Sequence, residues 1–185
     1  MEHFYDKIIS GENWFDFQDI YKKMVDTSSD NSHFVEVGVW KGMSACFMAV
    51  EIINSGKNIK FDCVDTWEFF DWFTDISKES FEGLYDTFLN NIEPVKDYVK
   101  VVKKISWEAA LDYENESLDF IFIDASHDYE SVKKDINAWL PKLKINGLMA
   151  GHDYYHIPVS NAVNDIFGVE NISPTSTCWT YKKIK

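Results

Sequence analysis

The chain is short of positive charge, and this shortage bears on the ligands it can bind. Eighteen lysine and arginine residues stand against 31 aspartate and glutamate residues, which gives a formal net charge of −13. Binding to the backbone of DNA or RNA depends on a stripe of cations. Lysine pairs such as Lys22-Lys23 and Lys103-Lys104 are instead dispersed along the chain. We therefore expect no nucleic-acid partner.

Long apolar runs and an even set of cysteines are also lacking. No apolar segment approaches the roughly 20 residues of a membrane-spanning helix, and Met1-Glu2-His3 does not open a signal peptide. Cys46, Cys63 and Cys178 are isolated and odd in number, which favours free thiols in a reducing compartment. These features predict a cytoplasmic protein without a membrane partner.

What the chain does contain is a regular alternation of apolar and amphipathic segments. Its 185 residues, 45% of them hydrophobic, predict a single domain 1–185, with a helical N-terminal segment 1–30 and a core 31–185. We expect strands near 33–38, 60–65, 98–103, 118–124, 146–151, 167–172 and 177–183, and helices near 42–55, 78–92, 107–112, 129–141 and 158–167. This order predicts an α/β, Rossmann-like, doubly wound sheet.

Residues 34–44 carry the strongest functional pattern. A short apolar run contains Glu36 and ends at Gly38, and Gly42 follows at the start of a predicted helix. Such a pattern is typical of a buried parallel strand that turns tightly into a helix. Glycines at the turn let a ligand approach the backbone, and the free amides of a helix start favour negative charge.

The spacing of these glycines indicates which class of nucleotide cofactor the turn can bind. The dinucleotide fingerprint G-x-G-x-x-G requires a second glycine where Trp40 stands, and a P-loop requires a lysine where Met43 stands. Glu36 would also repel a polyphosphate. A cofactor with adenosine, no phosphate and an ammonium group fits better, and S-adenosylmethionine is such a molecule. A nicotinamide-dependent oxidoreductase stays open as the alternative.

A second apolar run, 61–65, ends in Asp65. A carboxylate at the tip of the second strand of a doubly wound sheet is placed to bind the two ribose hydroxyls of an adenosine cofactor. Trp67, two residues further on, could stack on adenine or pack in the core.

Four segments together resemble the class I S-adenosylmethionine-dependent methyltransferases of the methyltransferase-24 type. They are Glu36-x-Gly38-x-x-x-Gly42-x-Ser44, Val64-Asp65-Thr66-Trp67, residues 120–129 and residues 140–154. The resemblance covers roughly 30–170 and implies a mostly parallel seven-stranded sheet whose last strand is antiparallel. It also implies S-adenosylmethionine as cofactor, with Glu36 near its ammonium group, Ser44 as a further contact, and Ser106 at the adenine edge or as a helix cap.

The resemblance further places acids and histidines at the tips of the fourth and fifth strands. Asp124 could face the cofactor's methyl group, orient a base or hold a metal, and His127 could accept the proton of an acceptor hydroxyl. With His152 and Asp153, Asp124 could bind Mg²⁺ or Mn²⁺. We favour a hydrogen-bonded group of side chains without metal, in which Asp124, His127 and Asp153 are the catalytic residues.

The predicted function is methyl transfer from S-adenosylmethionine to a small molecule or a sugar, at oxygen. A methyltransferase-like module that binds the cofactor without turnover is the alternative from another class. Four aromatic residues between acids in 68–75 could line the acceptor pocket, or form a flap or a homodimer contact.

Overall fold

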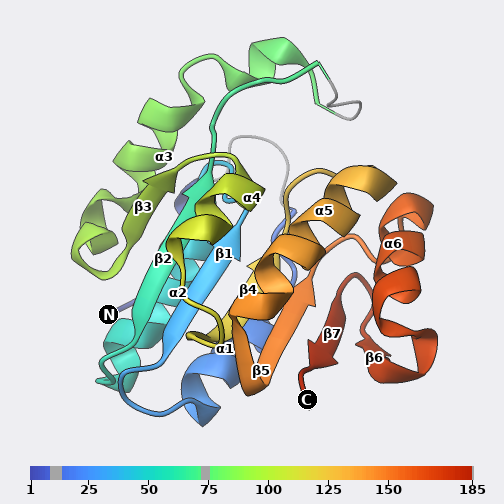
Figure 1. The fold of residues 1–185 in the computed structure, drawn as a ribbon. Coiled ribbons are helices and arrows are strands. Elements are labelled where there is room, and N and C mark those ends of the chain that lie inside the picture. The colour runs from blue at the N-terminus through green and yellow to red at the C-terminus, as the bar shows by residue number, and fades with distance from the viewer. Residues whose placement is uncertain (9–13, 72–75, 185) are drawn as a thin grey trace.

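The computed structural model describes residues 1–8, 14–71 and 76–184. Seven strands form one sheet in the order β3-β2-β1-β4-β5-β7-β6, with helices on both of its faces (Figure 1). The strands are β1 (His33–Val37), β2 (Lys60–Asp65), β3 (Lys100–Lys103), β4 (Leu118–Ile123), β5 (Leu143–Gly151), β6 (Ile172–Pro174) and β7 (Trp179–Lys182). The α-helices are α1 (Gln18–Thr27), α2 (Met43–Ser55), α3 (Leu84–Ile92), α4 (Ser106–Ala109), α5 (Tyr129–Trp139) and α6 (Ile157–Phe167).

Strands β1 to β5 are parallel, and β7 runs antiparallel to both of its neighbours, β5 and β6. This arrangement confirms the predicted fold. In a parallel sheet of this kind, ligands bind beyond the carboxyl ends of the strands where the strand order reverses. Here that point lies between β1 and β4, because β1 pairs with β2 on one side and with β4 on the other.

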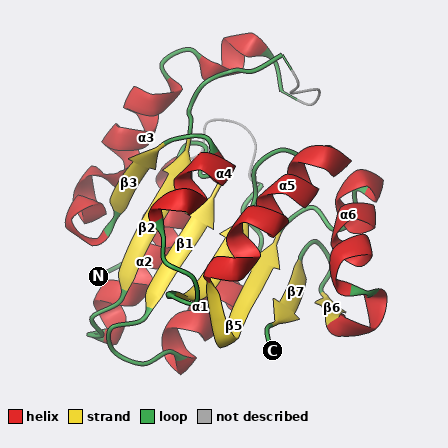
Figure 2. Ribbon diagram, in the orientation of Figure 1, coloured by secondary structure: helices red, strands yellow, loops and turns green. Residues whose placement is uncertain are grey.

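Helices cover both faces of the sheet (Figure 2), and the alternation of side chains along the strands divides the core into two layers. Phe34 of β1 and Phe120 of β4 pack with α1, α2 and α3, whereas Val35 and Ile121 pack with α4, α5 and α6. Strands buried on both faces read as nearly continuous apolar runs, which is why the sequence shows no clean alternation there.

Helix α5 begins at the expected residue, Tyr129. Asp128 caps its start by accepting a hydrogen bond from the backbone of Ser131 at 2.9 Å, and Val132, Ile136 and Trp139 form its buried stripe. The apolar stripe therefore faces the sheet.

Several element boundaries differ from the sequence prediction. The helix expected at 78–92 is divided into a 3₁₀ turn and α3, because Gly83 adopts φ +65° between them. The sixth strand begins at Ile172, after α6 and a 3₁₀ turn that occupy the expected 167–171. At the N-terminus, where a helical segment 1–30 was expected, α1 begins only at Gln18, and Trp14 precedes it.

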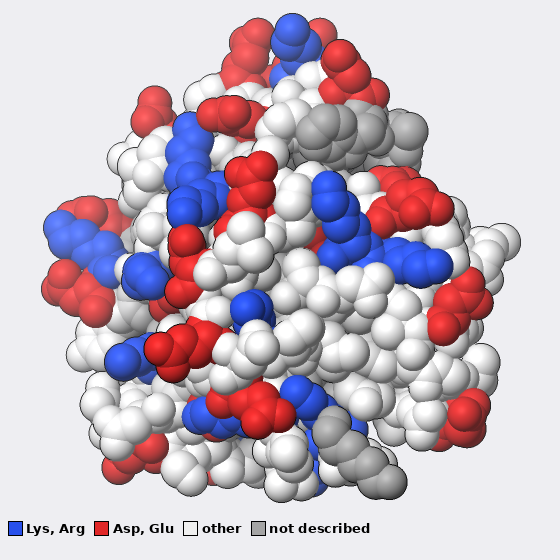
Figure 3. Space-filling view, in the orientation of Figure 1, with Lys and Arg blue, Asp and Glu red and all other residues white. Residues whose placement is uncertain are grey.

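Lysines and acids are interspersed over the face shown in Figure 3. No helix in the described part of the chain is long and apolar enough to cross a membrane.

Candidate functional site

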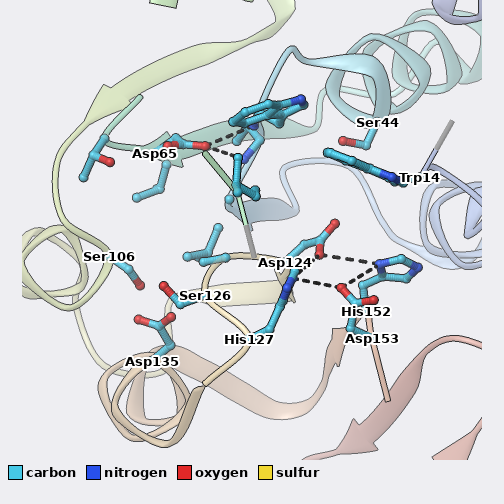
Figure 4. Close-up of a pocket in the computed structure, with 18 of the residues that line it drawn as sticks. Trp14, Ser44, Asp65, Ser106, Asp124, Ser126, His127, Asp135, His152 and Asp153 are labelled. Carbon is cyan, nitrogen blue, oxygen red and sulfur yellow. Dashed lines mark hydrogen bonds and ion pairs between the residues drawn. The ribbon is translucent and has the colours of Figure 1, made fainter. Parts of the chain in front are cut away.

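A cavity of about 800 Å³ opens at the carboxyl ends of β1, β2, β4 and β5. Its walls come from residues that follow these strands, from the start of α4 and from the segment 14–17 that precedes α1. Ser44, Asp65 and Ser106 lie around one part of it, and the acids and histidines after β4 and β5 lie around another (Figure 4). The cavity is large enough for a cofactor and an acceptor together.

The glycine turn after β1 brings the backbone close to β4. Gly38 has φ +83°, and a Cβ built on it would lie 2.0 Å from the carbonyl oxygen of Asp124. Glycine is therefore required by the packing of the two strand ends, while the same residue also lines the cavity. Gly42 has a different role: its missing Cβ would lie 2.8 Å from the ring of Phe88, on the side of α3.

Asp65 lines the cavity and organises the turn beside it. Its Oδ2 accepts the backbone N–H groups of Val39 at 2.8 Å and Trp40 at 3.0 Å, and its Oδ1 accepts that of Trp67 at 2.8 Å. Burial raises the pKa of Asp65, and these backbone donors oppose the rise. A carboxylate offers about four acceptor positions, so three internal bonds leave room for about one ribose hydroxyl rather than two.

Trp67 lies in the core and not at the adenine position. Its side chain is 3% exposed, its Nε1 donates to the backbone oxygen of Trp40 at 2.9 Å, and its ring packs against Tyr85 and Phe88. The positive φ of Trp67, +51°, turns the chain inward directly after β2. The proposed stacking of Trp67 on adenine is therefore corrected to a packing role.

Glu36 lies behind the cavity wall, and Ser44 stands between it and the cavity. The Ser44 hydroxyl donates to Oε1 of Glu36, and Ser44 lines the cavity, whereas Glu36 is 1% exposed. Burial raises the pKa of Glu36 to about 8, although the bond from Ser44 opposes the rise. A contact between Glu36 and a ligand would therefore run through the serine hydroxyl.

Ser106 occupies the far corner of the cavity, at the start of α4. Its Oγ accepts the indole N–H of Trp139 at 2.9 Å, and Asp135 lies at the same corner of the cavity (Figure 4). Asp135 lines the cavity but is 2% exposed, and burial raises its pKa to about 7. Sequence reasoning missed Asp135, although an acid on the same helical face as Val132 and Trp139 is a recognisable signal.

Acids and histidines after β4 and β5 form one connected group (Figure 4). Asp153 Oδ2 lies 2.9 Å from His127 Nε2 and 3.2 Å from His152 Nδ1, and Asp124 Oδ1 lies 3.6 Å from that same Nδ1. On its other side, His152 Nε2 lies 3.1 Å from Asp16, a residue that the sequence did not single out. The structure thus brings together all four residues predicted at these two strand tips.

The charges in this group stabilise one another. Burial lowers the pKa of His152, but hydrogen bonds to Asp124 and Asp153 outweigh it and raise the value to about 10. Burial likewise opposes the ionised form of Asp153, yet hydrogen bonds from His127 and His152 hold its pKa well below the usual range. His152 is therefore an imidazolium at neutral pH, clamped between carboxylates.

The same residues offer candidate ligands for a metal ion. Asp124, His152 and Asp153 offer ligand atoms that lie within 4.8 Å of one another. Two carboxylates and an imidazole suit Mn²⁺ better than Mg²⁺, which prefers an all-oxygen octahedron. Because His152 is an imidazolium that bridges both acids, an ion would have to displace its proton.

Aromatic rings form the wall opposite the acids. Trp14 lies 6.0 Å from Trp40 between ring centroids, and Trp40 lies 5.3 Å from Phe81. Trp14 is 49% exposed, so it presents its ring to the mouth of the cavity. Of the predicted aromatic segment 68–75, Phe70 lines the cavity, whereas residues 72–75 lie outside the described part of the chain.

Comparison with known proteins adds independent findings. Residues 35–154, well over half of the chain, match a family model described as a methyltransferase domain. An uncharacterized protein of Sinorhizobium fredii is 28% identical over 123 residues, which make up 64% of this chain. The chain spans only 13% of the length of that relative.

Several solved structures share the fold. The O-methyltransferase NovP has a TM-score of 0.67 at 15% identity, covering 91% of this chain and 79% of NovP. A putative rRNA methylase from Clostridium thermocellum has a TM-score of 0.66 at 11% identity, covering 95% of this chain and all of the other. A putative methyltransferase from Streptococcus mutans, solved with S-adenosylhomocysteine (SAH), has a TM-score of 0.63 at 11% identity, covering 94% and 100%.

Proposed function

Since the chain belongs to the methyltransferase domain family, whose methyl donor is S-adenosylmethionine, we propose that it methylates an oxygen of a small molecule or a sugar. Membership of this family excludes the alternative that the chain is a nicotinamide-dependent oxidoreductase. The observation that carries the proposal is the position of Asp153, which binds both His127 and His152 at the edge of the cavity that Ser44, Asp65 and Ser106 also line.

The donor would lie along the ends of β1 and β2. Ser44, backed by Glu36, would accept a hydrogen bond from the ammonium group, and Asp65 would bind one ribose hydroxyl. Ser106 would meet the edge of the base. These residues fit the chemistry of the cofactor, because each pairs an oxygen acceptor with a donor on the ligand.

The acceptor would lie between the donor and the aromatic wall. The cofactor, held by Ser44, Asp65 and Ser106, would supply an electrophilic methyl group for transfer to the acceptor oxygen. His127 takes the proton of the acceptor hydroxyl, and the resulting imidazolium is stabilised by Asp153, 2.9 Å from Nε2. Alignment of the two reactants and exclusion of water supply the remainder of the acceleration.

The negative net charge of the chain and the acids around the cavity favour a small-molecule acceptor over RNA. The chain has no arginine and a formal net charge of −13, and its cavity is edged by Asp16, Asp124 and Asp153. A polyphosphate strand would meet repulsion there. The exposed ring of Trp14 instead suits stacking on a flat ring or on the apolar face of a sugar.

Deuterated S-adenosylmethionine tests the proposal. The purified protein would be incubated with S-adenosylmethionine carrying a deuterated methyl group and with panels of phenols, sugars and RNA oligonucleotides, followed by mass spectrometry. We expect the label on an oxygen of a phenol or a sugar. Label on RNA would contradict the acceptor class, and SAH binding without labelling of any acceptor would support a binding module without turnover.

We also propose that the protein works in the cytoplasm and forms a homodimer. All three cysteines are buried free thiols, which supports a reducing compartment such as the cytoplasm. A homodimer through the aromatic mouth of the cavity would be seen as a doubled mass in light scattering.

A further inference from the structure

The segment 14–17, which precedes α1, alternates between buried and open side chains. Phe15 and Phe17 are buried in the core layer that contains α1 and α2. Trp14 is 49% exposed and the side chain of Asp16 is equally exposed, and both line the cavity. The two phenylalanines therefore anchor a short segment that presents an aromatic ring and a carboxylate at the edge of the cavity.

One oxygen of the Asp16 carboxylate is bonded within the protein and the other is not. Its Oδ1 accepts the hydroxyl of Thr177 at 3.0 Å and lies 3.1 Å from His152 Nε2. Its Oδ2 has no hydrogen bond or ion pair with any residue in the described part of the chain. The first oxygen therefore fixes the direction of the side chain, and the second is open to a donor on a ligand.

Asp124 offers a second carboxylate of the same kind. Figure 4 shows its side chain directed from the end of β4 into the space that Trp14 faces. Both of its ion pairs, 3.6 Å to His152 Nδ1 and 4.0 Å to His127 Nε2, are made by Oδ1. Its Oδ2 has no partner among the described residues, so a ligand against the ring of Trp14 can donate to it as well.

Negative charge exceeds positive charge at this end of the cavity. Three carboxylates stand there: those of Asp16, Asp124 and Asp153. They face one imidazolium, that of His152, so two negative charges are left over. Lys41 and Lys104 also line the cavity, but no ion pair joins either of them to these acids in the described part of the chain. The sulfonium of the proposed donor offsets one charge, and a cation on the acceptor would offset the other.

We propose that Trp14 and Asp16 select an acceptor that carries an ammonium group, an amino sugar, and that one of its hydroxyls receives the methyl group. The proposal rests on the proposed function, because it takes this cavity to methylate an oxygen of a sugar. The apolar face of the sugar ring stacks on Trp14, and the ammonium group donates to the open oxygens of Asp16 and Asp124. A protonated amine has no lone pair, so the hydroxyl oxygen and not the nitrogen is the nucleophile.

Matched sets of acceptors test the proposal. Glucosamine, galactosamine and mannosamine would each be compared with two uncharged partners: the N-acetyl form, and the parent sugar with a hydroxyl in place of the amine. Transfer from deuterated S-adenosylmethionine would be followed by mass spectrometry, which gives kcat/KM and the labelled atom. We expect wild type to label an oxygen of at least one amino sugar, with kcat/KM about tenfold or more above both partners, because their charge-assisted hydrogen bonds are lost with the charge.

Asp16→Asn removes the charge but keeps an oxygen that can accept the Thr177 hydroxyl. It should reduce the preference for the amino sugar by roughly fivefold or more, through KM and not through kcat, and Asp16→Glu should restore part of it. Asp19→Asn is the matched control, because Asp19 is an exposed acid of α1 that does not line the cavity, and it should leave the preference unchanged. A merely structural role for Asp16 would instead slow all members of a set equally.

Ionic strength gives a second measurement on wild type, which decides the matter should Asp16→Asn not fold. The KM of the amino sugar should rise with added salt, because screening weakens its attraction to the half-exposed carboxylate, whereas the KM of an uncharged partner should not change.

The outcomes separate the two proposals. Equal kcat/KM within every set, label on nitrogen, or label on a phenol or an uncharged sugar but on no amino sugar would overturn the selection of a cation; the last of these would leave oxygen methylation intact. No label on any acceptor, although SAH binds, would overturn the proposed function and this selection with it. Failure of wild type to bind SAH would instead overturn the placement of the cofactor.

Discussion

Asp65→Ala removes a side chain that both holds the turn after β1 and lines the proposed cofactor site. The carboxylate accepts the backbone N–H groups of Val39, Trp40 and Trp67, so its removal leaves three donors without their acceptor. At about 1 kcal/mol or more for each lost bond, we expect the free energy of unfolding to fall by about 3 kcal/mol. We also expect SAH affinity to fall by about 100-fold, since the turn and a ribose bond are lost together.

Urea unfolding of the free protein and calorimetric titration with SAH measure the two effects. Asp62→Asn is the matched control, because Asp62 is a buried acid on the same strand, bonded to Lys100 and Tyr113 and away from the cavity. It should lower stability but leave SAH affinity of the folded protein within about twofold. If Asp65→Ala changed neither quantity, the assignment of Asp65 to the turn and to the ribose would be refuted.

Three further changes test other parts of the site. His127→Ala should keep SAH affinity within about twofold but slow methyl transfer at least 100-fold, which single-turnover kinetics would show; an unchanged rate at every pH would exclude it as the base. Gly38→Ala should destabilise the protein by more than 3 kcal/mol in urea, because its Cβ would lie 2.0 Å from a backbone oxygen of β4; normal stability would contradict the packing. Glu36→Gln should remove part of the pH dependence of the free energy of unfolding. Burial raises the pKa of Glu36 from 4.5 to about 8, so Glu36 in the folded protein stays protonated up to about pH 8. The contribution of Glu36 to stability is therefore fully present below about pH 4.5, and about a few kcal/mol of it is lost as the pH rises to 8. Parallel curves of unfolding free energy against pH for wild type and variant would contradict this.

The sequence predicted a doubly wound, mostly parallel sheet and the acids near four of its strand ends, for a physical reason. Parallel strands with covered faces are apolar throughout, and their carboxyl ends meet at one edge of the sheet. Asp65, Asp124 and Asp153 each end or follow such a run, so their convergence follows from topology alone, whereas Glu36 lies within its strand.

Side-chain direction and long-range contacts could not be predicted in this way. Trp67 turns into the core because the backbone after β2 adopts φ +51°, which no local pattern in the sequence indicates. Asp16 reaches His152 across 136 residues, and that contact exists only once α1 has packed on the sheet. The role of Gly42 likewise depends on Phe88, which α3 brings to it.

The most direct test of the central claim is a crystal structure of the protein with SAH. The account predicts the ligand in the 800 Å³ cavity, its amino-acid end at Ser44, its ribose beside Asp65 and its base against Ser106. A ligand bound elsewhere, or one lying in the reverse direction with its base at Ser44, would contradict it.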